Sequence, residues 1–412
     1  MRIAERSTYL RQARRFSRNA RLFLLSQLLA GIASGVYSLL FNLYLVRLGY
    51  DERFIGEVNG LSVLATGLVA FPAGLLADRI GRRRTMIIGG FVPAIAFFGQ
   101  STVPGAQAIL LFGIVAGAGI AMVTVCFSPF MAENSGPEDR PYLFSASFAL
   151  MTLAGMTGSL IGGNLPRLFA DLFGWPVDSS APFRLALQLA AVMFGLAAVP
   201  FLLTKESPRS FVQAEPERPS ISMAHADIRR RMLSFAVVNV LVGIAGGLIL
   251  PFFNVYFLKT FGLPAQRVGL IFAVSQALMA LGVLLAPALV RRTGKVNAIV
   301  AGHFATVPFL LILAVAGNPW VAASAYWGRN LAMNIISPIQ GTFAMEMVPV
   351  RRRATLSGIS TMAWNTTWAI SSVVGGVLIL VLGYPAMFLI SAAGYAITGG
   401  VYLLAFRRYR NL

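Results

Sequence analysis

The stretch GLLADRIGRRR, from Gly74 to Arg84, places one aspartate and four arginines between two strongly apolar runs. The chain has 412 residues, of which 57% are hydrophobic and only 12% are charged. Soluble domains ordinarily carry about 25% charged residues. The surplus apolar surface must therefore face lipid or form an outsized core, and the length of the apolar runs decides between these.

Apolar runs of on the order of 20 residues, long enough to cross a bilayer, recur along the whole chain. Because lipid cannot satisfy a free backbone amide, such runs are expected to be helices. The alternation typical of a transmembrane barrel does not occur. The sequence predicts an all-α membrane protein with twelve transmembrane helices, at residues 22–46, 54–77, 85–103, 107–132, 142–165, 182–203, 232–258, 268–290, 296–317, 319–346, 356–382 and 384–406.

The net charge of +19 could indicate a nucleic-acid partner, but its distribution argues against one. Of the 34 Lys and Arg residues, 27 fall in the N-terminal arm, the even-numbered loops and the C-terminal tail, and six fall on the opposite side. This asymmetry follows the positive-inside rule. It predicts a multi-pass protein of the plasma (inner) membrane with both termini cytoplasmic. The basic arm from Arg2 to Arg21 is expected to rest on anionic membrane lipid.

The chain contains an internal repeat. GIASGVYSLLFNLYL, from Gly31, aligns with GIAGGLILPFFNVYF, from Gly243, at an offset of 212 residues. An offset of 213 then aligns further positions, among them Gly56 with Gly269, Gly81 with Gly294, Glu133 with Glu346, Arg140 with Arg353, and Gly162–Gly163 with Gly375–Gly376. The sequence therefore predicts two homologous six-helix bundles in two pseudo-symmetric halves, residues 1–204 and 232–412, joined by a cytoplasmic linker at 205–231.

Two such halves resemble the major facilitator superfamily. The family signature Gly-x-Leu-Ala-Asp-Arg-x-Gly-Arg-Arg/Lys, between the second and third helices, stands here at Gly74, Leu76, Ala77, Asp78, Arg79, Gly81, Arg82 and Arg83. A degraded copy, PALVRRTGK, follows the eighth predicted helix. The resemblance implies a secondary transporter that works by alternating access, usually as a monomer, and the chain looks most similar to the bacterial drug-exporter branch.

The signature predicts a gate. A carboxylate at Asp78 can bond backbone amides at a helix N-terminus, and the resemblance implies that this is the eleventh helix, near Thr355 to Gly358. The expected gating residues are Gly74, Asp78, Arg79, Gly81, Arg82 and Arg83, with Glu133, Arg140, Glu346 and Arg353 extending the same latch. The alternatives are that the arginines only anchor the topology and that the two glutamates form solvated salt bridges.

The fifth predicted helix carries a weaker signature. The stretch GSLIGG, from Gly158 to Gly163, resembles the Gly-Pro-x-x-Gly-Gly motif of proton-coupled exporters, with Ser159 in place of proline. Close packing of helices at small residues explains the same pattern equally well.

Candidate substrate-binding residues follow from helical spacing on the first, seventh and tenth helices, which the family places around a central cavity. They are Gln27, Ser34, Tyr37, Asn42, Asn239, Asn254, Tyr326, Arg329, Met333 and Gln340, together with Trp364 and Trp368 on the eleventh helix. The alternative for each small polar residue is that it only holds helices together.

Arg329 lies ten residues into its helix, about 15 Å deep and close to the midplane of the bilayer. A charge there is costly and should face the interior with a partner. None of the fifteen acidic residues is predicted near the midplane. Either the substrate supplies the negative charge, or Arg329 bonds backbone carbonyls or extends toward the interface.

Proton coupling is suggested by the exporter resemblance, yet the acid usual in the first or fourth helix is absent. The proton-coupling candidates are Glu57, Asp78 and His303. Of these, histidine has an unperturbed pKa near neutral pH, which suits a proton switch. A lone histidine on an apolar helix is more often a hydrogen-bonded packing residue. A facilitator or an anion exchanger stays open.

No phosphate-binding Gly-x-x-x-x-Gly-Lys-Ser/Thr loop occurs, and two histidines with one cysteine do not make an ordinary zinc site. The sequence predicts no enzyme, no cofactor, no metal and no nucleic acid. It predicts export of amphipathic small molecules, with protons as a further candidate partner. The alternatives are uptake or exchange of a small organic anion recognised by Arg329, and a non-transporting membrane sensor.

Overall fold

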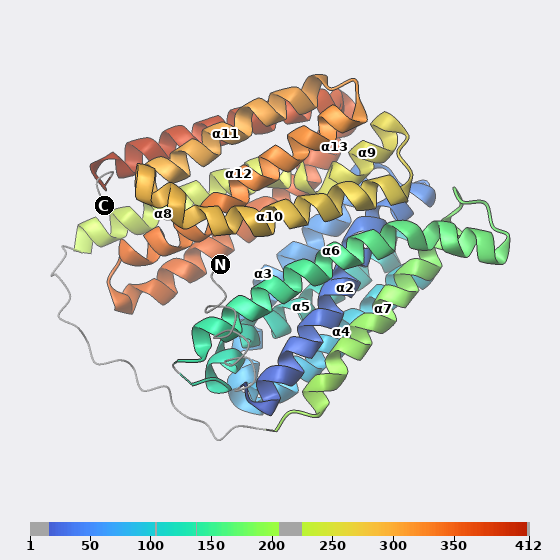
Figure 1. Cartoon of the computed structure of the whole chain (residues 1–412), viewed down its shortest axis with the longest axis horizontal. Helices are drawn as coiled ribbons and strands as arrows, with labels where there is room; N and C mark the ends of the chain where they lie inside the picture. Colours follow the sequence, from blue (N-terminus) through green and yellow to red (C-terminus); the bar gives the residue numbers. More distant parts are fainter. Residues whose placement is uncertain (1–15, 104, 137, 206–224, 410–412) are drawn as a thin grey trace, which may run out of the picture. The chain divides into compact units, whose positions relative to one another are not determined.

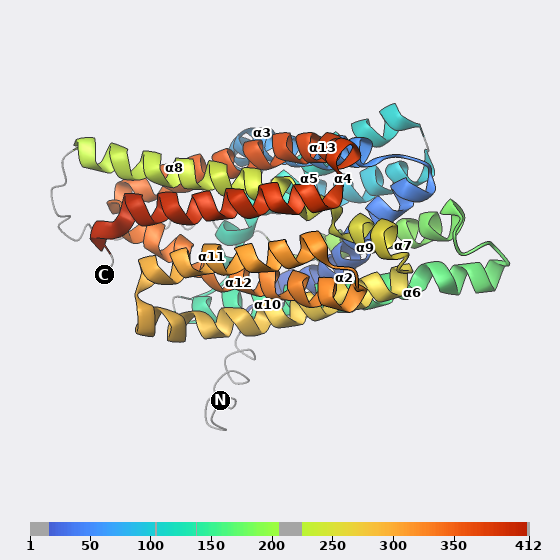
Figure 2. The same ribbon diagram turned by 90° about the horizontal axis from the view of Figure 1, so that it is seen from above.

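The computed structural model describes residues 16–103, 105–136, 138–205 and 225–409. The basic arm before residue 16 and most of the predicted linker lie outside these residues. Within them the chain is helical, and Figures 1 and 2 show long helices joined by short connections. The long helices arise because apolar segments in lipid must satisfy their backbone groups internally.

The first half of the chain forms six helices: α2 (Arg18–Arg47), α3 (Glu52–Ile80), α4 (Arg82–Thr102), α5 (Ala106–Glu133), α6 (Arg140–Phe173) and α7 (Ser180–Leu202). The second half forms α8 (His225–Gly247), η1 (Leu250–Phe252), α9 (Phe253–Phe261), α10 (Ala265–Thr293), α11 (Lys295–Val315), α12 (Pro319–Glu346), α13 (Val350–Phe406) and η2 (Arg407–Tyr409).

Two departures from the predicted helices occur in the second half. The predicted helix 232–258 is interrupted after Gly247, and the chain continues through η1 into α9. Pro251, in the first turn of η1, has no backbone N–H for a continuing helix. The last two predicted helices form the single element α13, which Gly383 breaks with a φ of 78°. The fold is therefore the predicted twelve-span architecture, with its seventh span divided into α8, η1 and α9.

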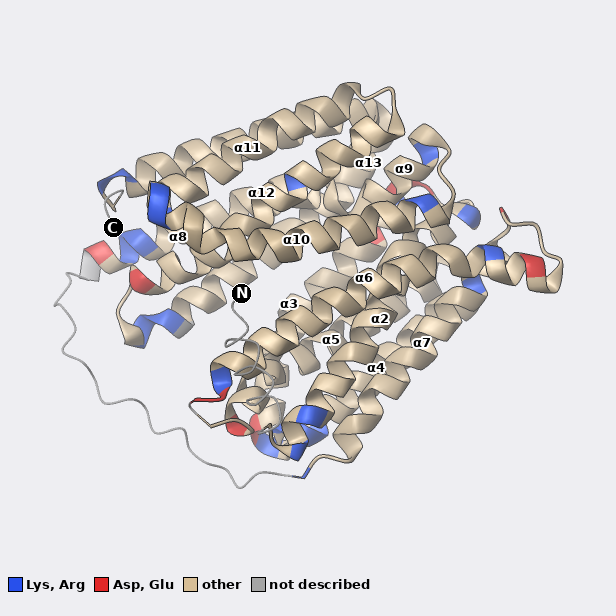
Figure 3. Ribbon diagram, in the orientation of Figure 1, with Lys and Arg blue, Asp and Glu red and all other residues tan. Residues whose placement is uncertain are grey.

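Ten segments of the described chain are long and apolar enough to cross a membrane, with the two spans of α13 counted as one. Helix α12 is not among them because it is more polar. Figure 3 shows the charged residues gathered at helix ends and in loops, with one basic position inside α12. Arg329 is the only Lys or Arg in that helix.

The chain divides into two compact units that do not follow the sequence halves throughout. Unit 1 comprises Met1–Leu48, Leu64–Gln213 and Pro264–Ala273, and unit 2 comprises Gly49–Val63, Ala214–Leu263 and Val274–Leu412. The start of α3 thus belongs to unit 2, while the start of α10 belongs to unit 1. The sequence-based boundaries at 204 and 232 remain a prediction.

Glycine contacts position these two helix starts. In unit 1, a Cβ on Gly163 of α6 would lie 2.8 Å from the carbonyl oxygen of Ala265 in α10. In unit 2, a Cβ on Gly60 of α3 would lie 2.6 Å from the carbonyl oxygen of Ala369 in α13. Since real Cβ atoms do not approach this closely, only glycine permits these contacts. The GSLIGG stretch therefore packs helices, and its exporter-specific role remains a prediction.

The repeat is visible in matched contacts. The Tyr44 hydroxyl donates to the Ser101 carbonyl at 3.0 Å, and the Tyr256 hydroxyl donates to the Leu313 carbonyl at the same distance. Gly81 and Gly294 precede α4 and α11 with φ values of 91° and 77°. These positive values favour glycine, which explains why both copies of the signature keep this residue.

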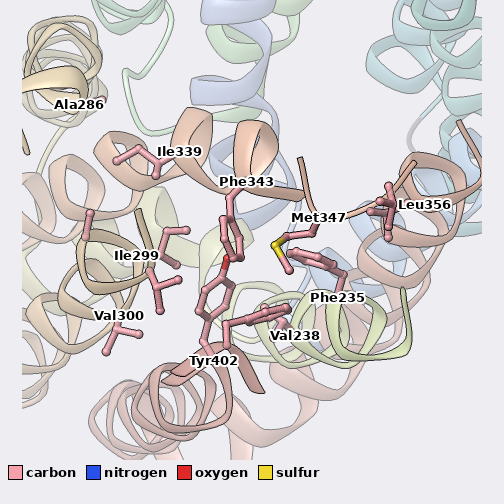
Figure 4. Packing of buried hydrophobic residues seen from close by; sticks show 14 residues of the cluster. Phe235, Val238, Ala286, Ile299, Val300, Ile339, Phe343, Met347, Leu356 and Tyr402 are labelled. Atoms are coloured by element: carbon pink, nitrogen blue, oxygen red, sulfur yellow. The ribbon is translucent and has the colours of Figure 1, made fainter. Parts of the chain in front are cut away.

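Each unit has a buried aromatic cluster. In unit 1, Phe23 packs against Phe127, Phe130 and Phe201 from α5 and α7, with ring centroids 5.2 to 6.2 Å apart. In unit 2 the cluster joins five helices, and its members include Phe235 of α8, Ala286 of α10, Val296 and Ile299 of α11, Phe343 of α12, and Tyr402 and Phe406 of α13. Figure 4 shows the Phe343 and Tyr402 side chains facing each other at its centre.

We expect Phe343→Ala to destabilise the protein by about 3–5 kcal/mol, because Phe343 is 1% exposed and its loss leaves a cavity. Phe71→Ala is the matched control, since Phe71 is 76% exposed and packs little within the chain. Thermal unfolding in detergent should show a lower midpoint for the first variant and little change for the second. Equal midpoints for the two variants would contradict the assignment of this cluster as a core.

Candidate functional site

A cavity of about 470 Å³ opens within unit 2 between α8, α12 and α13. Its lining includes Phe235, Asn239, Val242 and Gly246 of α8, Arg329, Met333, Asn334, Ser337 and Gln340 of α12, and Ser357, Ser360, Thr361, Trp364, Tyr395 and Tyr402 of α13. The lining combines aromatic and apolar side chains with amides, hydroxyls and one guanidinium. It contains no acidic side chain.

Five of the predicted substrate-binding residues line this cavity: Asn239, Arg329, Met333, Gln340 and Trp364. They come from three different helices, so the structure brings together residues that the sequence placed on separate faces. Lining a cavity does not test binding, and their role remains a prediction.

Three other candidates of the second half lie outside this lining. Tyr326 is buried, with its ring centroid 4.6 Å from that of Phe253. Asn254 is 2% exposed, and its side-chain oxygen accepts the Val255 N–H at 3.0 Å. The Trp368 ring centroid lies 6.2 Å from that of the cavity-lining Trp364.

The four candidates on α2 belong to unit 1. Gln27 and Asn42 are buried, and Ser34 is exposed. Tyr37 donates a hydrogen bond to the Gln100 side chain and packs its ring 4.0 Å from that of Phe97. These contacts leave their predicted role in binding untested.

Arg329 is the only charged residue of the cavity lining. It is 4% exposed. Its Nη1 donates to Asn330 Oδ1 at 2.9 Å, and its Nη2 donates to the Tyr395 hydroxyl. Its Cζ also lies 5.2 Å from the Tyr395 ring centroid, in a cation–π contact. Asn330 is held in turn by Ser275, since its Nδ2 donates to Ser275 Oγ at 2.9 Å.

These contacts orient the guanidinium but do not neutralise it. No carboxylate pairs with Arg329 among the described residues, and its Nε has no hydrogen-bond partner there. A buried charge without a counter-ion is costly, so this residue is a natural point of contact for a negatively charged group.

His303 of α11 lies behind the cavity wall. It is fully buried, and its Nε2 lies 3.0 Å from Nε2 of Gln340, which lines the cavity. The two nitrogens are within hydrogen-bonding distance, and the histidine tautomer decides which of them donates. This contact matches the packing interpretation of His303, and its role in proton coupling remains a prediction.

Predicted gating residues at the helix ends form contacts within each unit. Arg82 of α4 pairs with Glu133 of α5, and Lys295 of α11 pairs with Glu346 of α12 at 2.5 Å. The two pairs are related by the 213-residue offset. The glutamates therefore pair across helices rather than with the nearby Arg140 or Arg353. The repeat held a signal for these pairs, since the basic residues Arg82 and Lys295 align at the same offset as the two glutamates.

The remaining signature residues have separate surroundings. The Arg83 guanidinium donates to the Phe201 and Leu202 carbonyls at the end of α7, at 3.3 and 2.7 Å. Arg140 donates to the Ala132 carbonyl at 3.3 and 3.0 Å. The other members lie at or near the ends of helices: Asp78, Arg79 and Arg353 are exposed, and Gly74 has no neighbour in the space that a Cβ would occupy. Their part in gating remains a prediction.

The sequence analysis missed Glu52, which it placed in a loop. Glu52 is the first residue of α3 and is 3% exposed. Its carboxylate contacts Lys259 of α9 and Tyr384 of α13. The candidate Glu57, on the same helix, instead pairs with Arg53 at 2.9 Å on a partly exposed face.

The family is settled by comparison with known proteins. A model described as the Major Facilitator Superfamily matches residues 23–365. The chain belongs to the Major Facilitator Superfamily.

Several relatives of this superfamily member are similar in sequence. An uncharacterized MFS-type transporter of Methanocaldococcus jannaschii, MJ1560, is 22% identical over 89% of this chain and 92% of its own length. The Arabidopsis thaliana plastidic glucose transporter 4 is 30% identical over 41% of this chain. That match covers 30% of the glucose transporter, and a match to the putative metabolite transport protein YwtG of Bacillus subtilis covers 36%, so the chain spans about a third of these two relatives.

Solved structures share the fold. The nucleoside transporter NupG superimposes with a TM-score of 0.76 at 18% identity, over 95% of this chain and 100% of that chain. A bacterial homolog of the human lysosomal transporter Spinster gives 0.76 at 16% identity, over 94% and 96%. Membership of this superfamily, together with its candidate membrane-spanning helices, makes the chain a multi-pass membrane protein.

We expect Tyr395→Phe to lower stability, because it removes the hydroxyl that accepts from Arg329 and leaves a buried charge less satisfied, at a cost of about 1.5–3 kcal/mol. Tyr402→Phe is the matched control. The Tyr402 hydroxyl is buried without a hydrogen-bond partner among the described residues, so its removal should be neutral or stabilising. Thermal unfolding of both variants tests this, and an equal loss in both would contradict the Arg329 geometry.

Proposed function

We propose that this transporter carries amphipathic small molecules that bear a negative charge, and that the cavity of unit 2 binds them. The observation that carries the proposal is the buried, uncompensated guanidinium of Arg329 in the wall of that cavity. Ligand sites are typically apolar surfaces with a few placed polar groups that fix orientation. This cavity has that composition.

The apolar part of the cargo would pack on Phe235, Met333 and Trp364, which line the cavity together with Arg329. Gln340 and Asn239 offer amide groups to the polar part. Tyr395 and Asn330 already hold two guanidinium nitrogens, so the charge stays oriented when the cavity is empty. Such preorganisation reduces the cost of ordering the site on binding.

The direction of transport that we propose is export, working by alternating access with a midplane site. The resemblance to exporters supports it, as does 32% identity to the Lactococcus lactis multi-drug resistance efflux pump PmrA homolog, over 32% of both chains. A D-xylose transporter of Levilactobacillus brevis is also similar, at 27% identity over 46% of this chain. Uptake or exchange of an organic anion is therefore the second candidate, which Arg329 supports equally.

The test is flux into and out of proteoliposomes with paired compounds: an amphipathic aryl carboxylate, its neutral amide and an amine of similar size. We expect the carboxylate to be transported. Arg329→Gln should reduce its flux at least tenfold, because the variant lacks the guanidinium that would pair with the carboxylate of the cargo. Arg167→Gln is the control, since the Arg167 side chain is 64% exposed and lies at the other end of α6 from Arg140. Flux is compared between vesicles that hold the protein in each of its two orientations, which distinguishes export from uptake.

Transport of the amide or amine that persists in Arg329→Gln would overturn the anion claim. Arg329 would then be a structural residue held by Tyr395 and Asn330. Saturable binding of the carboxylate without flux in any orientation would favour the sensor alternative instead.

A further inference from the structure

A basic pocket lies apart from the cavity, between the start of α8 and the end of α13. It has a volume of about 310 Å³ and shares no lining residue with the cavity of Arg329. Its lining comprises Asp227, Arg230, Arg231 and Ser234 of α8, Leu404, Ala405 and Phe406 of α13, and Arg407, Arg408 and Tyr409 of η2. Figure 3 shows basic positions at both of these helix ends. All the lining residues belong to unit 2, and we call this space the arginine pocket.

The charges of the arginine pocket are not balanced within its lining. Four guanidinium groups accompany one carboxylate, that of Asp227, whose Oδ2 lies 4.0 Å from Arg231 Nη2. The Asp227 side chain is 62% exposed, so this pair contributes little. Because like charges repel, the excess of positive charge is unfavourable, and a bound anion would relieve it.

Arg231 is held in place by contacts with the protein. Its Nη1 donates to the Met347 carbonyl after α12 at 3.1 Å, and its Cζ lies 5.0 Å from the Tyr409 ring centroid. Its Nε is buried and has no hydrogen-bond partner among the described residues. The guanidinium is therefore oriented in advance and keeps donor capacity that the protein does not use.

The internal repeat provides a reference for this junction. In each half, three phenylalanines join the first, fourth and sixth spans through ring contacts, namely Phe23, Phe130 and Phe201 in the first half and Phe235, Phe343 and Phe406 in the second. The end of α7 therefore corresponds to the end of α13, and the start of α2 corresponds to the start of α8.

Unit 1 closes the corresponding junction with a neutral side chain. Asn19, which aligns with Arg231, donates from Nδ2 to Asn134 Oδ1 at 2.7 Å and to the Lys205 carbonyl at 2.8 Å. Its Oδ1 accepts the Lys205 N–H at 3.1 Å. Asn134 aligns with Met347, so one asparagine makes the contact that Arg231 makes and also binds the segment after α7. The bundle does not require an arginine at this position.

Two general rules explain single arginines near this pocket but not their convergence. Positive charge flanking a membrane span sets its orientation, and a cation at a helix C-terminus complements the macrodipole. The first rule is satisfied by arginines elsewhere, such as Arg291 and Arg292 at the end of α10, and the second applies only to Arg407 and Arg408. Neither rule calls for four guanidiniums around one hollow.

An exposed apolar face of α13 leads away from the pocket. Leu404, which belongs to the lining, is 70% exposed, and Ile397 is 56% exposed. The two residues are seven positions apart and lie on the same face of the helix. Gly400 lies between them and has no neighbour where a Cβ would be placed. A fatty acyl chain can pack along such a face, whereas a soluble anion would gain nothing from it.

We propose that the arginine pocket binds the phosphate group of an anionic phospholipid, with an acyl chain along the Leu404 face of α13. Guanidinium groups suit phosphate because their planar N–H groups donate in pairs to its oxygens. Basic pockets between transmembrane helices are recognised sites for lipid headgroups. The headgroup would join α8 to η2 and so tie the first span of unit 2 to its last. This lipid is a partner rather than cargo, and the site does not depend on the proposed function.

The test measures lipid binding to the full chain in a neutral detergent by native mass spectrometry. The probes are dioleoyl phosphatidylglycerol, dioleoyl phosphatidylcholine and inorganic phosphate. We expect wild type to bind phosphatidylglycerol about tenfold more tightly than phosphatidylcholine, because only the former brings net negative charge to the guanidiniums. Arg230→Gln/Arg408→Gln should abolish most of this preference. Both side chains are exposed, so the fold should not depend on them.

Arg291→Gln/Arg292→Gln is the matched control. These two arginines lie in the last turn of α10, are exposed and do not line the pocket, so this variant loses the same net charge outside the site. It should keep the wild-type preference. Asp227→Asn should strengthen binding of phosphatidylglycerol several-fold, because it removes the one carboxylate that competes with the phosphate.

Equal losses in the two double variants would show that only the overall charge attracts the lipid, and would overturn the site. Displacement of phosphatidylglycerol by inorganic phosphate at equal concentration would overturn the lipid assignment and identify a soluble phosphate as the ligand. Weaker binding in Asp227→Asn would contradict the electrostatic argument. Since no cargo is used, these outcomes are independent of the flux experiment with Arg329.

Discussion

The close approach of helices at glycine is the constraint on which the rest of this structure depends. Lipid tails are as apolar as the helix surfaces, so no hydrophobic force drives the helices together, and packing contacts must do so. Gly163 against Ala265 and Gly376 against Glu52 bring the starts of α10 and α3 within backbone distance of α6 and α13. The second of these contacts also fixes the Glu52 backbone, which explains how a helix-start glutamate reaches Lys259 and Tyr384.

The features that the sequence predicted well are those set by long segments. Apolar runs impose helices because lipid leaves the backbone no other partner, and the fold has the expected twelve spans. The expected depth of Arg329 rests on the same argument, since it lies ten positions into its helix, and this depth remains a prediction. The expectation that no acid lies near Arg329 rests on the positions of the acidic residues alone.

Features set by tertiary contacts could not be predicted in this way. The break after Gly247 differs, since Pro251 was a local signal for it, although Gly247 also lies against the Trp368 carbonyl of α13. Glu52 follows Asp51 and precedes Arg53, so its local sequence is that of a loop, and it is buried where it contacts α9 and α13. The pairs Arg82–Glu133 and Lys295–Glu346 join residues 51 positions apart, which neither local spacing nor hydropathy encodes.

Comparison of the two halves distinguishes contacts that occur in both six-helix bundles from residues that occur in only one. The Arg82–Glu133 pair, the tyrosine–carbonyl bond of Tyr44 and the positive-φ Gly81 all recur in the second half, as expected of contacts that hold a six-helix bundle. The two buried charged side chains of the described residues do not recur. At the 213-residue offset, Arg329 corresponds to Ala116, which is fully buried, and Glu52 corresponds to Ala265. Alanine at each counterpart shows that the bundle packs without either charge.

The two unmatched charges have complementary properties. Arg329 is a buried cation with no acid beside it, in the wall of a cavity, while Glu52 is a buried acid paired with a lysine that reaches solution. Desolvation works against both, and the repeat removes a packing explanation for both. A carrier requires one site that recognises its cargo and one contact that can be made and broken as it changes state. The broken symmetry marks Arg329 as the candidate for the first of these requirements.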